Sequence, residues 1–152
     1  MNFPDIAELV PHDGGMVLLD RVLAADTEQL TAELTIGPAT LFCDGSGVGA
    51  WVGVEYMAQA IAAYAGSLAR QRGEAPKVGF LLGARRYQCN VPSFTLGTVL
   101  HVHAQHAMQG ENGLGAFECR IEDAASGALL AQATITVFEP SNVNEFLQRS
   151  FS

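Results

Sequence analysis

The longest apolar stretch of the chain covers residues 50–70, AWVGVEYMAQAIAAYAGSLAR. Apolar side chains would point in every direction from a helix formed by this stretch, and a helix without a polar stripe is buried on most of its sides. At about 1.5 Å per residue, about 20 residues span about 30 Å, which is the width of a small domain. The pattern therefore predicts a long central helix, around which the rest of the chain is organised.

Two polar residues, Glu55 and Gln59, interrupt the apolar character of this helix. They are four residues apart, so their side chains share one face. About 20 apolar residues are also enough to cross a bilayer, but a carboxylate and an amide in the middle of a lipid-embedded helix cost several kcal/mol. The sequence therefore favours a helix in a protein core, with one polar opening at Glu55, and no membrane span.

Strand patterns flank the helix on both sides. Residues 30–36 alternate between apolar and polar side chains, which is the period of a half-buried strand. Before them, the apolar run of residues 16–19, continued by residues 21–25, predicts a first strand. After the helix, apolar runs predict strands over residues 78–82, 98–106, 115–121 and 129–138. Gly and Asn in residues 109–113 predict a hairpin turn, the Gly-rich residues 37–49 predict a loop, and residues 4–10 predict a short helix.

The predicted order of elements is a short helix, a pair of strands, a long buried helix and a run of antiparallel strands. A curled antiparallel sheet wrapped around one helix satisfies every one of these patterns. This α+β arrangement is known as the hotdog fold, and it leaves a sheet edge and the start of the central helix where a second copy can cover them. We expect one domain over residues 1–140, followed by a loosely attached tail over residues 141–152.

Composition narrows the choice of partners and compartment. Hydrophobic residues make up 49% of the 152 residues and charged residues only 16%, which favours burial at a subunit interface. The net charge of −8 argues against a nucleic-acid partner, because phosphates require a basic surface. Cys43, Cys89 and Cys119 show no CxxC spacing, so we predict neither a disulfide framework nor a zinc site. The N-terminus has no secretory signal pattern, and we expect a cytoplasmic protein with reduced thiols.

Basic residues concentrate at the end of the central helix and after it. The cluster consists of Arg70, Arg72, Lys77, Arg85 and Arg86. Cations complement the negative end of a helix dipole, so the cluster fits a solvated helix end. It also fits a docking site for a phosphate or an acidic carrier protein, in which Lys77, Arg85 and Arg86 would make the contacts. The sequence leaves both interpretations open.

Three motifs, in the same order along the chain, resemble one enzyme family. Residues 9–22 contain LVPH and MVLLDRV, residues 55–60 read E-Y-M-A-Q-A, and residues 91–102 contain a Val-Pro pair followed by Gly97 and a strand. Together they resemble the 3-hydroxyacyl-acyl carrier protein dehydratases of fatty acid synthesis. Within that family, AWVGVEYMAQA and GFLLGARRY resemble the dehydratase-like hotdog protein of aryl polyene pigment clusters.

The resemblance implies a dimer, either of identical subunits or with another hotdog dehydratase subunit. It implies an interface tunnel for a pantetheine-linked acyl chain, carried by acyl carrier protein or coenzyme A, and no other cofactor. In the dehydratases a Glu on the central helix pairs with a His from the loop before the partner's helix, and Glu55 matches that Glu. The corresponding loop here, LFCDGSGVG over residues 41–49, contains no histidine, and Asp44 is its only carboxylate.

Dehydration of a 3-hydroxyacyl thioester requires a base for the α-proton, an acid for the departing hydroxyl and N–H donors for the thioester oxygen. Glu55 is the candidate catalytic acid, Gln59 and Asp44 are possible accessory residues, and the backbone amides of Ala50 and Trp51 are candidate donors. The base is missing. Three alternatives stay open: a partner subunit supplies the histidine, Glu55 activates water in a thioesterase, or the site is inactive and the chain is a structural partner.

The histidines do not predict a metal site. His101 and His103 fall on one face of a predicted strand, which would suit a pair of metal ligands. A structural or catalytic zinc site requires at least a third protein ligand, and the sequence pattern offers none beside them. We therefore predict no bound metal.

Overall fold

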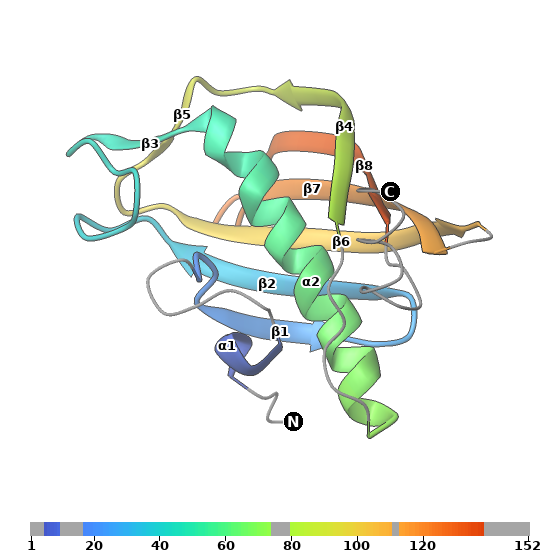
Figure 1. The fold of residues 1–152 in the computed structure, drawn as a ribbon. Coiled ribbons are helices and arrows are strands. Elements are labelled where there is room, and N and C mark those ends of the chain that lie inside the picture. The colour runs from blue at the N-terminus through green and yellow to red at the C-terminus, as the bar shows by residue number, and fades with distance from the viewer. Residues whose placement is uncertain (1–4, 10–16, 74–79, 111–112, 139–152) are drawn as a thin grey trace, which may run out of the picture.

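The structure is a computed structural model, and it describes residues 5–9, 17–73, 80–110 and 113–138 (Figure 1). Its elements in chain order are α1 (Ile6–Leu9), β1 (Arg21–Ala25), β2 (Gln29–Thr35), β3 (Gly47–Gly49), a 3-10 turn (Ala50–Val52), α2 (Gly53–Gln71), β4 (Phe80–Cys89), β5 (Ser93–Thr95), β6 (Val99–Gln109), β7 (Leu114–Asp123) and β8 (Leu129–Phe138).

One large sheet carries most of the fold. It has six antiparallel strands in the order β1-β2-β6-β7-β8-β4, while β3 and β5 form a separate two-stranded sheet near the start of α2. In Figure 1 the large sheet curls behind α2, which crosses its inner face. The short helix α1 packs against α2, where the backbone of Leu9 lies close to Gly66. The predicted α+β class, with a curved antiparallel sheet around one central helix, is confirmed.

The core lies between α2 and the sheet. The side of α2 that faces the sheet is buried and carries Tyr56, Met57, Ala60, Ile61, Ala63 and Tyr64. Opposite it, β2 buries Leu30 and Leu34 almost completely, and β6 does the same with Leu100. Fully burying one such side chain stabilises a fold by about 1.5–3 kcal/mol. The period-two burial predicted for residues 30–36 is therefore confirmed.

The other side of α2 is less covered than an all-apolar helix predicts. We call it the accessible side, and it consists of the exposed Trp51 in the preceding turn and the half-buried Val54, Glu55, Ala58, Ala62 and Ala65. Apart from Glu55 these side chains are apolar, and no other element within the described residues buries them fully. A helix that is apolar on all sides is explained if a surface outside this chain covers the accessible side.

Several boundaries differ from the prediction. The predicted central helix over residues 50–70 begins with a 3-10 turn and becomes α-helical only at Gly53. Residues 80–82 of the strand predicted over residues 78–82 begin a longer strand, β4, which continues to Cys89 through pairing with β8, while residues 78 and 79 lie outside the described residues. The short strands β3 and β5 were not expected. The predicted hairpin over residues 109–113 joins β6 and β7.

Two further observations are restricted to the described residues. No helix there is both long and apolar enough to pass through a bilayer. The three cysteines are free thiols, with Cys119 buried and Cys89 exposed. The predicted tail over residues 141–152 lies outside the described residues, as does Lys77.

Candidate functional site

Glu55 lies in the first turn of α2 and is held by Gln59 one turn later. The side-chain nitrogen of Gln59 donates to Glu55 Oε1 at 3.3 Å, and the side-chain oxygen of Gln59 accepts the backbone N–H of Leu18 at 2.8 Å. Gln59 has 0% exposure. Hydrogen bonds formed away from water are strong, so the amide has one fixed orientation. The structure thus brings together the two residues that the sequence grouped, and adds the anchor at Leu18.

The start of the helix is fixed from two directions at Ala50. Its backbone N–H donates to the carbonyl oxygen of Pro92 at 3.1 Å, and its carbonyl oxygen accepts the hydroxyl of Tyr87. The Ala50 N–H is therefore already used within the chain. Because the first N–H groups of a helix have no acceptor inside the helix, Trp51 is the better placed of the two predicted backbone donors.

Tyr87 is a residue of this site that sequence reasoning missed. It reaches from β4 to the start of α2, where a Cβ atom built on Gly53 would lie 2.1 Å from its hydroxyl oxygen. Burial raises the pKa of the Tyr87 hydroxyl, so the group stays a protonated donor at neutral pH. The signal in the sequence was Gly53, because a glycine inside a helix often marks the close approach of another group.

Asp44 forms a turn in the loop between β2 and β3. Its Oδ1 accepts the backbone N–H of Ser46 at 3.0 Å, the Ser46 hydroxyl at 2.7 Å and the N–H of Gly47 at 3.2 Å. These bonds, above all the one from the Ser46 backbone, hold the pKa of Asp44 below its usual range. A carboxylate with a lowered pKa is a weaker base. Asp44 is therefore a poor replacement for a histidine.

Arg85 and Arg86 lie at an irregularity in the register of β4, and both are exposed. Arg86 has a φ of 54°, and it lines a shallow hollow of about 340 Å³ with Glu118 and Arg120 among others. The alternation of β7 turns Glu118 and Arg120 away from α2. The structure therefore places these arginines on the outward side of the sheet and does not bring them together with Glu55.

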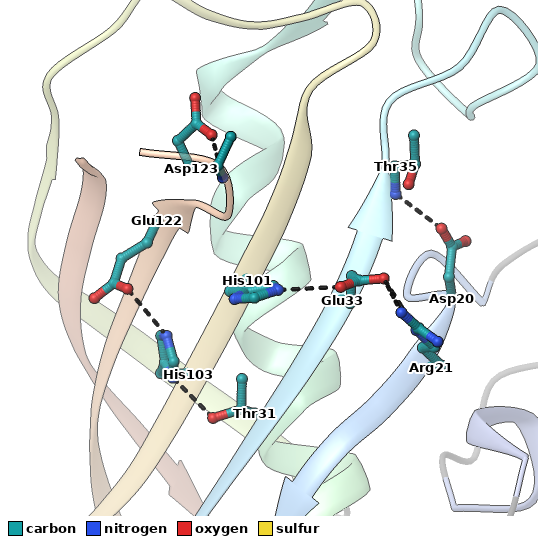
Figure 2. Close-up of polar contacts among 10 residues, drawn as sticks. Asp20, Arg21, Thr31, Glu33, Thr35, His101, His103, Glu122 and Asp123 are labelled. Carbon is teal, nitrogen blue, oxygen red and sulfur yellow. Dashed lines mark hydrogen bonds and ion pairs between the residues drawn. The ribbon is translucent and has the colours of Figure 1, made fainter. Parts of the chain in front are cut away.

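Two histidines of β6, His101 and His103, belong to a polar network on the outward face of the sheet, shown in Figure 2. The His101 Nε2 atom lies 3.0 Å from Glu33 Oε2, and the His103 Nδ1 atom lies 2.8 Å from the Thr31 hydroxyl. On its other side, His103 Nε2 is 3.4 Å from Glu122 Oε2. Within the described ranges, no group of three His, Cys, Asp or Glu side chains could hold a metal ion.

The arrangement can supply some of the groups that a dehydration requires. Glu55 is a partly accessible acid at the start of α2, and the Trp51 N–H lies about one turn before it. The three described histidines lie elsewhere: His101 and His103 face outward, and the ring of His106 is 6.0 Å from that of Tyr64, further along α2. None of these three can act as the base beside Glu55.

Several solved structures are similar to this chain. The dehydratase heterocomplex ApeI:P from Xenorhabdus doucetiae has 28% identity and a TM-score of 0.88, and the match covers 99% of this chain and 100% of that chain. A hypothetical thioesterase from Streptococcus pneumoniae, solved with coenzyme A, has 14% identity and a TM-score of 0.62, with 78% and 84% covered. The PaaI protein of E. coli has 16% identity and a TM-score of 0.61, with 78% and 81% covered.

Two comparisons by sequence were made, against curated proteins and against models of protein families. No curated protein matches the chain. The model of the ApeP-like family, described as ApeP dehydratase, matches residues 4–148. This span includes Glu55, the loop before α2 and every strand of the large sheet. The protein therefore belongs to the ApeP-like dehydratase family, and it is a dehydratase-like protein with the hotdog fold.

Proposed function

We propose that this chain is one half of a two-subunit dehydratase that removes water from a 3-hydroxyacyl thioester. The observation that carries the proposal is the position of Glu55 on the accessible side of α2, where a group from a second subunit can reach it. The loop over residues 41–49, which would carry the histidine in related dehydratases, has none. The heterocomplex formed by the relative from Xenorhabdus doucetiae supports a pairing of two different subunits.

In this mechanism a histidine of the partner subunit takes the α-proton of the substrate. The electron pair of the broken C–H bond forms the double bond between the α- and β-carbons, and the C–O bond at the β-carbon breaks. Glu55 donates a proton to the departing hydroxyl, so that water and a 2-enoyl thioester are the products. Negative charge that develops on the thioester oxygen is stabilised by the Trp51 N–H, while Gln59 orients the carboxyl group of Glu55.

The acyl group would be attached to a pantetheine arm, and the reaction requires no further cofactor. Acyl carrier protein is the proposed carrier, with coenzyme A as the alternative. Arg85 and Arg86 support this proposal because both are exposed and neither side chain forms an ion pair or hydrogen bond within the described residues. The net charge of the chain is −8, so these two cations form a local positive site that can attract an acidic carrier.

The proposal is tested by mixing this chain with a hotdog dehydratase subunit that carries a histidine in the loop before its central helix. We expect the mixture to convert a 3-hydroxyacyl thioester into the enoyl product, and we expect neither subunit to do so alone. Loss of a general acid lowers a rate by about 10²- to 10⁴-fold, so Glu55→Gln should abolish most of the activity while the complex still forms. Glu28→Gln, at an exposed position between β1 and β2, is the matched control and should leave the activity unchanged.

Other outcomes of the same experiment would identify the alternatives. A mixture that stays fully active with Glu55→Gln would mean that this chain is a structural partner only. Release of free thiol from an acyl thioester by this chain alone would mean a thioesterase.

The carrier is tested separately, by charge reversal. Arg86→Glu should weaken binding of holo acyl carrier protein, whereas Arg72→Glu makes the same change in net charge at the end of α2 and should not. If both variants bind the carrier protein as tightly as the unchanged chain, the basic cluster is a solvated surface and not a docking site.

A further inference from the structure

Two aromatic side chains stand exposed at the start of α2, and we call them the aromatic pair. Trp51 has 69% exposure and Phe42 has 50%. Their ring centroids are 5.4 Å apart with an interplanar angle of 58°, and the neighbouring Leu41 is also exposed. Large apolar groups that gather on a surface mark interaction sites more often than single exposed ones.

The conformation of the pair is fixed, although it gains little burial within the chain. Phe42 has a φ of 70°, in the left-handed region that is unfavourable for a bulky side chain. The indole of Trp51 lies over Gly49, where a Cβ atom would be 2.5 Å from its ring nitrogen. A side chain that is already held in place loses little freedom when it binds. Strain and exposure at the same position indicate a binding role and not a packing role.

The position of the pair determines what covers it. Trp51 begins the accessible side of α2, which continues through Val54 and Glu55 to Ala58. A side chain of a second subunit that reaches the carboxyl group of Glu55 must approach along this side. The surface that carries this side chain then lies over Trp51, one turn away, and over Phe42 beside it. This inference rests on the proposed function, in which a second subunit supplies a catalytic group to Glu55.

We propose that Phe42 and Trp51 are the anchor by which the second dehydratase subunit docks beside Glu55. The partner surface is an apolar recess that accepts the indole and the phenyl ring. Tryptophan is among the residues that contribute most to binding at protein interfaces. The same contact that makes the complex therefore places the partner's catalytic group at Glu55.

The test measures complex formation and not activity, with the full-length chain and a histidine-bearing hotdog dehydratase subunit. Trp51→Ala and Phe42→Gly should each raise the dissociation constant by about tenfold or more, as for truncation of a central interface residue. Met108→Ala and Leu114→Ala are the controls, because these residues have 62% and 42% exposure but lie at the β6–β7 end of the sheet. Both controls should bind within about twofold of the unchanged chain.

The single tryptophan of the chain provides a second measurement. When the chain is labelled with 5-fluorotryptophan, its one fluorine resonance reports on Trp51 alone. We expect this resonance to shift and to become protected from solvent when the partner is added. Thermal unfolding of each variant alone verifies that the fold is retained.

Three results would overturn the inference in distinguishable ways. If both variants bind the partner as tightly as the unchanged chain and the fluorine signal does not move, the pairing stands and the anchor is elsewhere. If the unchanged chain binds no such subunit, the proposed function fails and the docking site with it. If Trp51→Ala instead abolishes self-association of this chain, the aromatic pair serves a second copy and not a different subunit.

Discussion

Gln59 donates a hydrogen bond to Glu55 at 3.3 Å while its own side-chain oxygen accepts the backbone N–H of Leu18 at 2.8 Å. One buried amide therefore ties the candidate acid to the segment that leads into β1. The acid would be held in place by a residue that takes no part in proton transfer.

Replacing Gln59 by methionine, which has a similar volume, should lower the free energy of unfolding. The buried N–H of Leu18 would lose its acceptor, and an unsatisfied buried donor costs about 1–3 kcal/mol. Urea unfolding with an unchanged m-value would measure the loss. The control is Gln88→Met, at an exposed position of β4, which should change stability by less than about 0.5 kcal/mol. Equal effects at the two positions would contradict a structural role for the amide.

The contact between Tyr87 and Gly53 predicts a coupling between two substitutions. Gly53→Ala alone places a Cβ atom 2.1 Å from the Tyr87 hydroxyl oxygen, and forcing extra volume into a packed site costs about 1–3 kcal/mol. In a Tyr87→Phe background the same change should cost less, because the oxygen is gone. A double-mutant cycle of unfolding free energies measures the difference. Gly83→Ala has no atom within 4 Å of its new Cβ and should show no such coupling; additive effects of Gly53→Ala and Tyr87→Phe would refute the contact.

The pattern over residues 129–138 predicts β8 to the residue. The apolar run that begins at residue 16 predicts a longer first strand than the structure has, because β1 begins only at Arg21. The second half of β4 was not predictable in this way. It lies at the edge of the sheet with Arg85 and Arg86 exposed at a register shift, so it has no alternation to detect. The strands β3 and β5 form only by pairing with each other across a long loop of chain.

The candidate site was predictable where it depends on spacing along one helix. Glu55 and Gln59 are neighbours in any α-helix, and the structure has their hydrogen bond. Leu18 and Tyr87 come from other parts of the chain, so no local pattern predicts the contact of Leu18 with Gln59 or that of Tyr87 with Ala50. The sequence offers two roles for Asp44, because aspartate in a Gly-rich loop forms turns more often than it acts as a base. The three hydrogen bonds to its Oδ1 atom agree with the turn.

His103 makes the stability depend on pH near neutrality. Burial lowers the pKa of His103, and its Nε2 atom is buried without a well-formed hydrogen bond. In the unfolded chain a histidine has a pKa of about 6.5, so at lower pH the unfolded state binds more protons and is favoured. The stabilising contribution of the neutral ring is therefore fully present above about pH 6.5 and is lost as the pH falls below it.

Unfolding free energies measured between about pH 5.5 and 7.5 should show this slope, and His103→Gln should reduce it. The window avoids the carboxylates. For example, the side-chain hydrogen bond from Arg120 holds the pKa of Glu122 below its usual range, so the contribution of this carboxylate is lost only at lower pH. A slope that is the same with and without His103 would show that other groups cause the pH dependence.

The strained backbone at Phe42 predicts an unusual order of stabilities. With a φ of 70°, this position suits glycine better than any residue with a Cβ atom. Phe42→Gly should therefore be more stable than Phe42→Ala by about 1 kcal/mol, because the left-handed conformation costs an L-residue about 1–2 kcal/mol. Thermal or urea unfolding of the two variants measures the difference directly. At Leu41, the preceding residue, φ is not positive, so there the alanine variant should be the more stable one. If alanine is preferred at both positions, the loop does not hold Phe42 in the left-handed conformation, and the aromatic pair loses the fixed geometry on which its docking role depends.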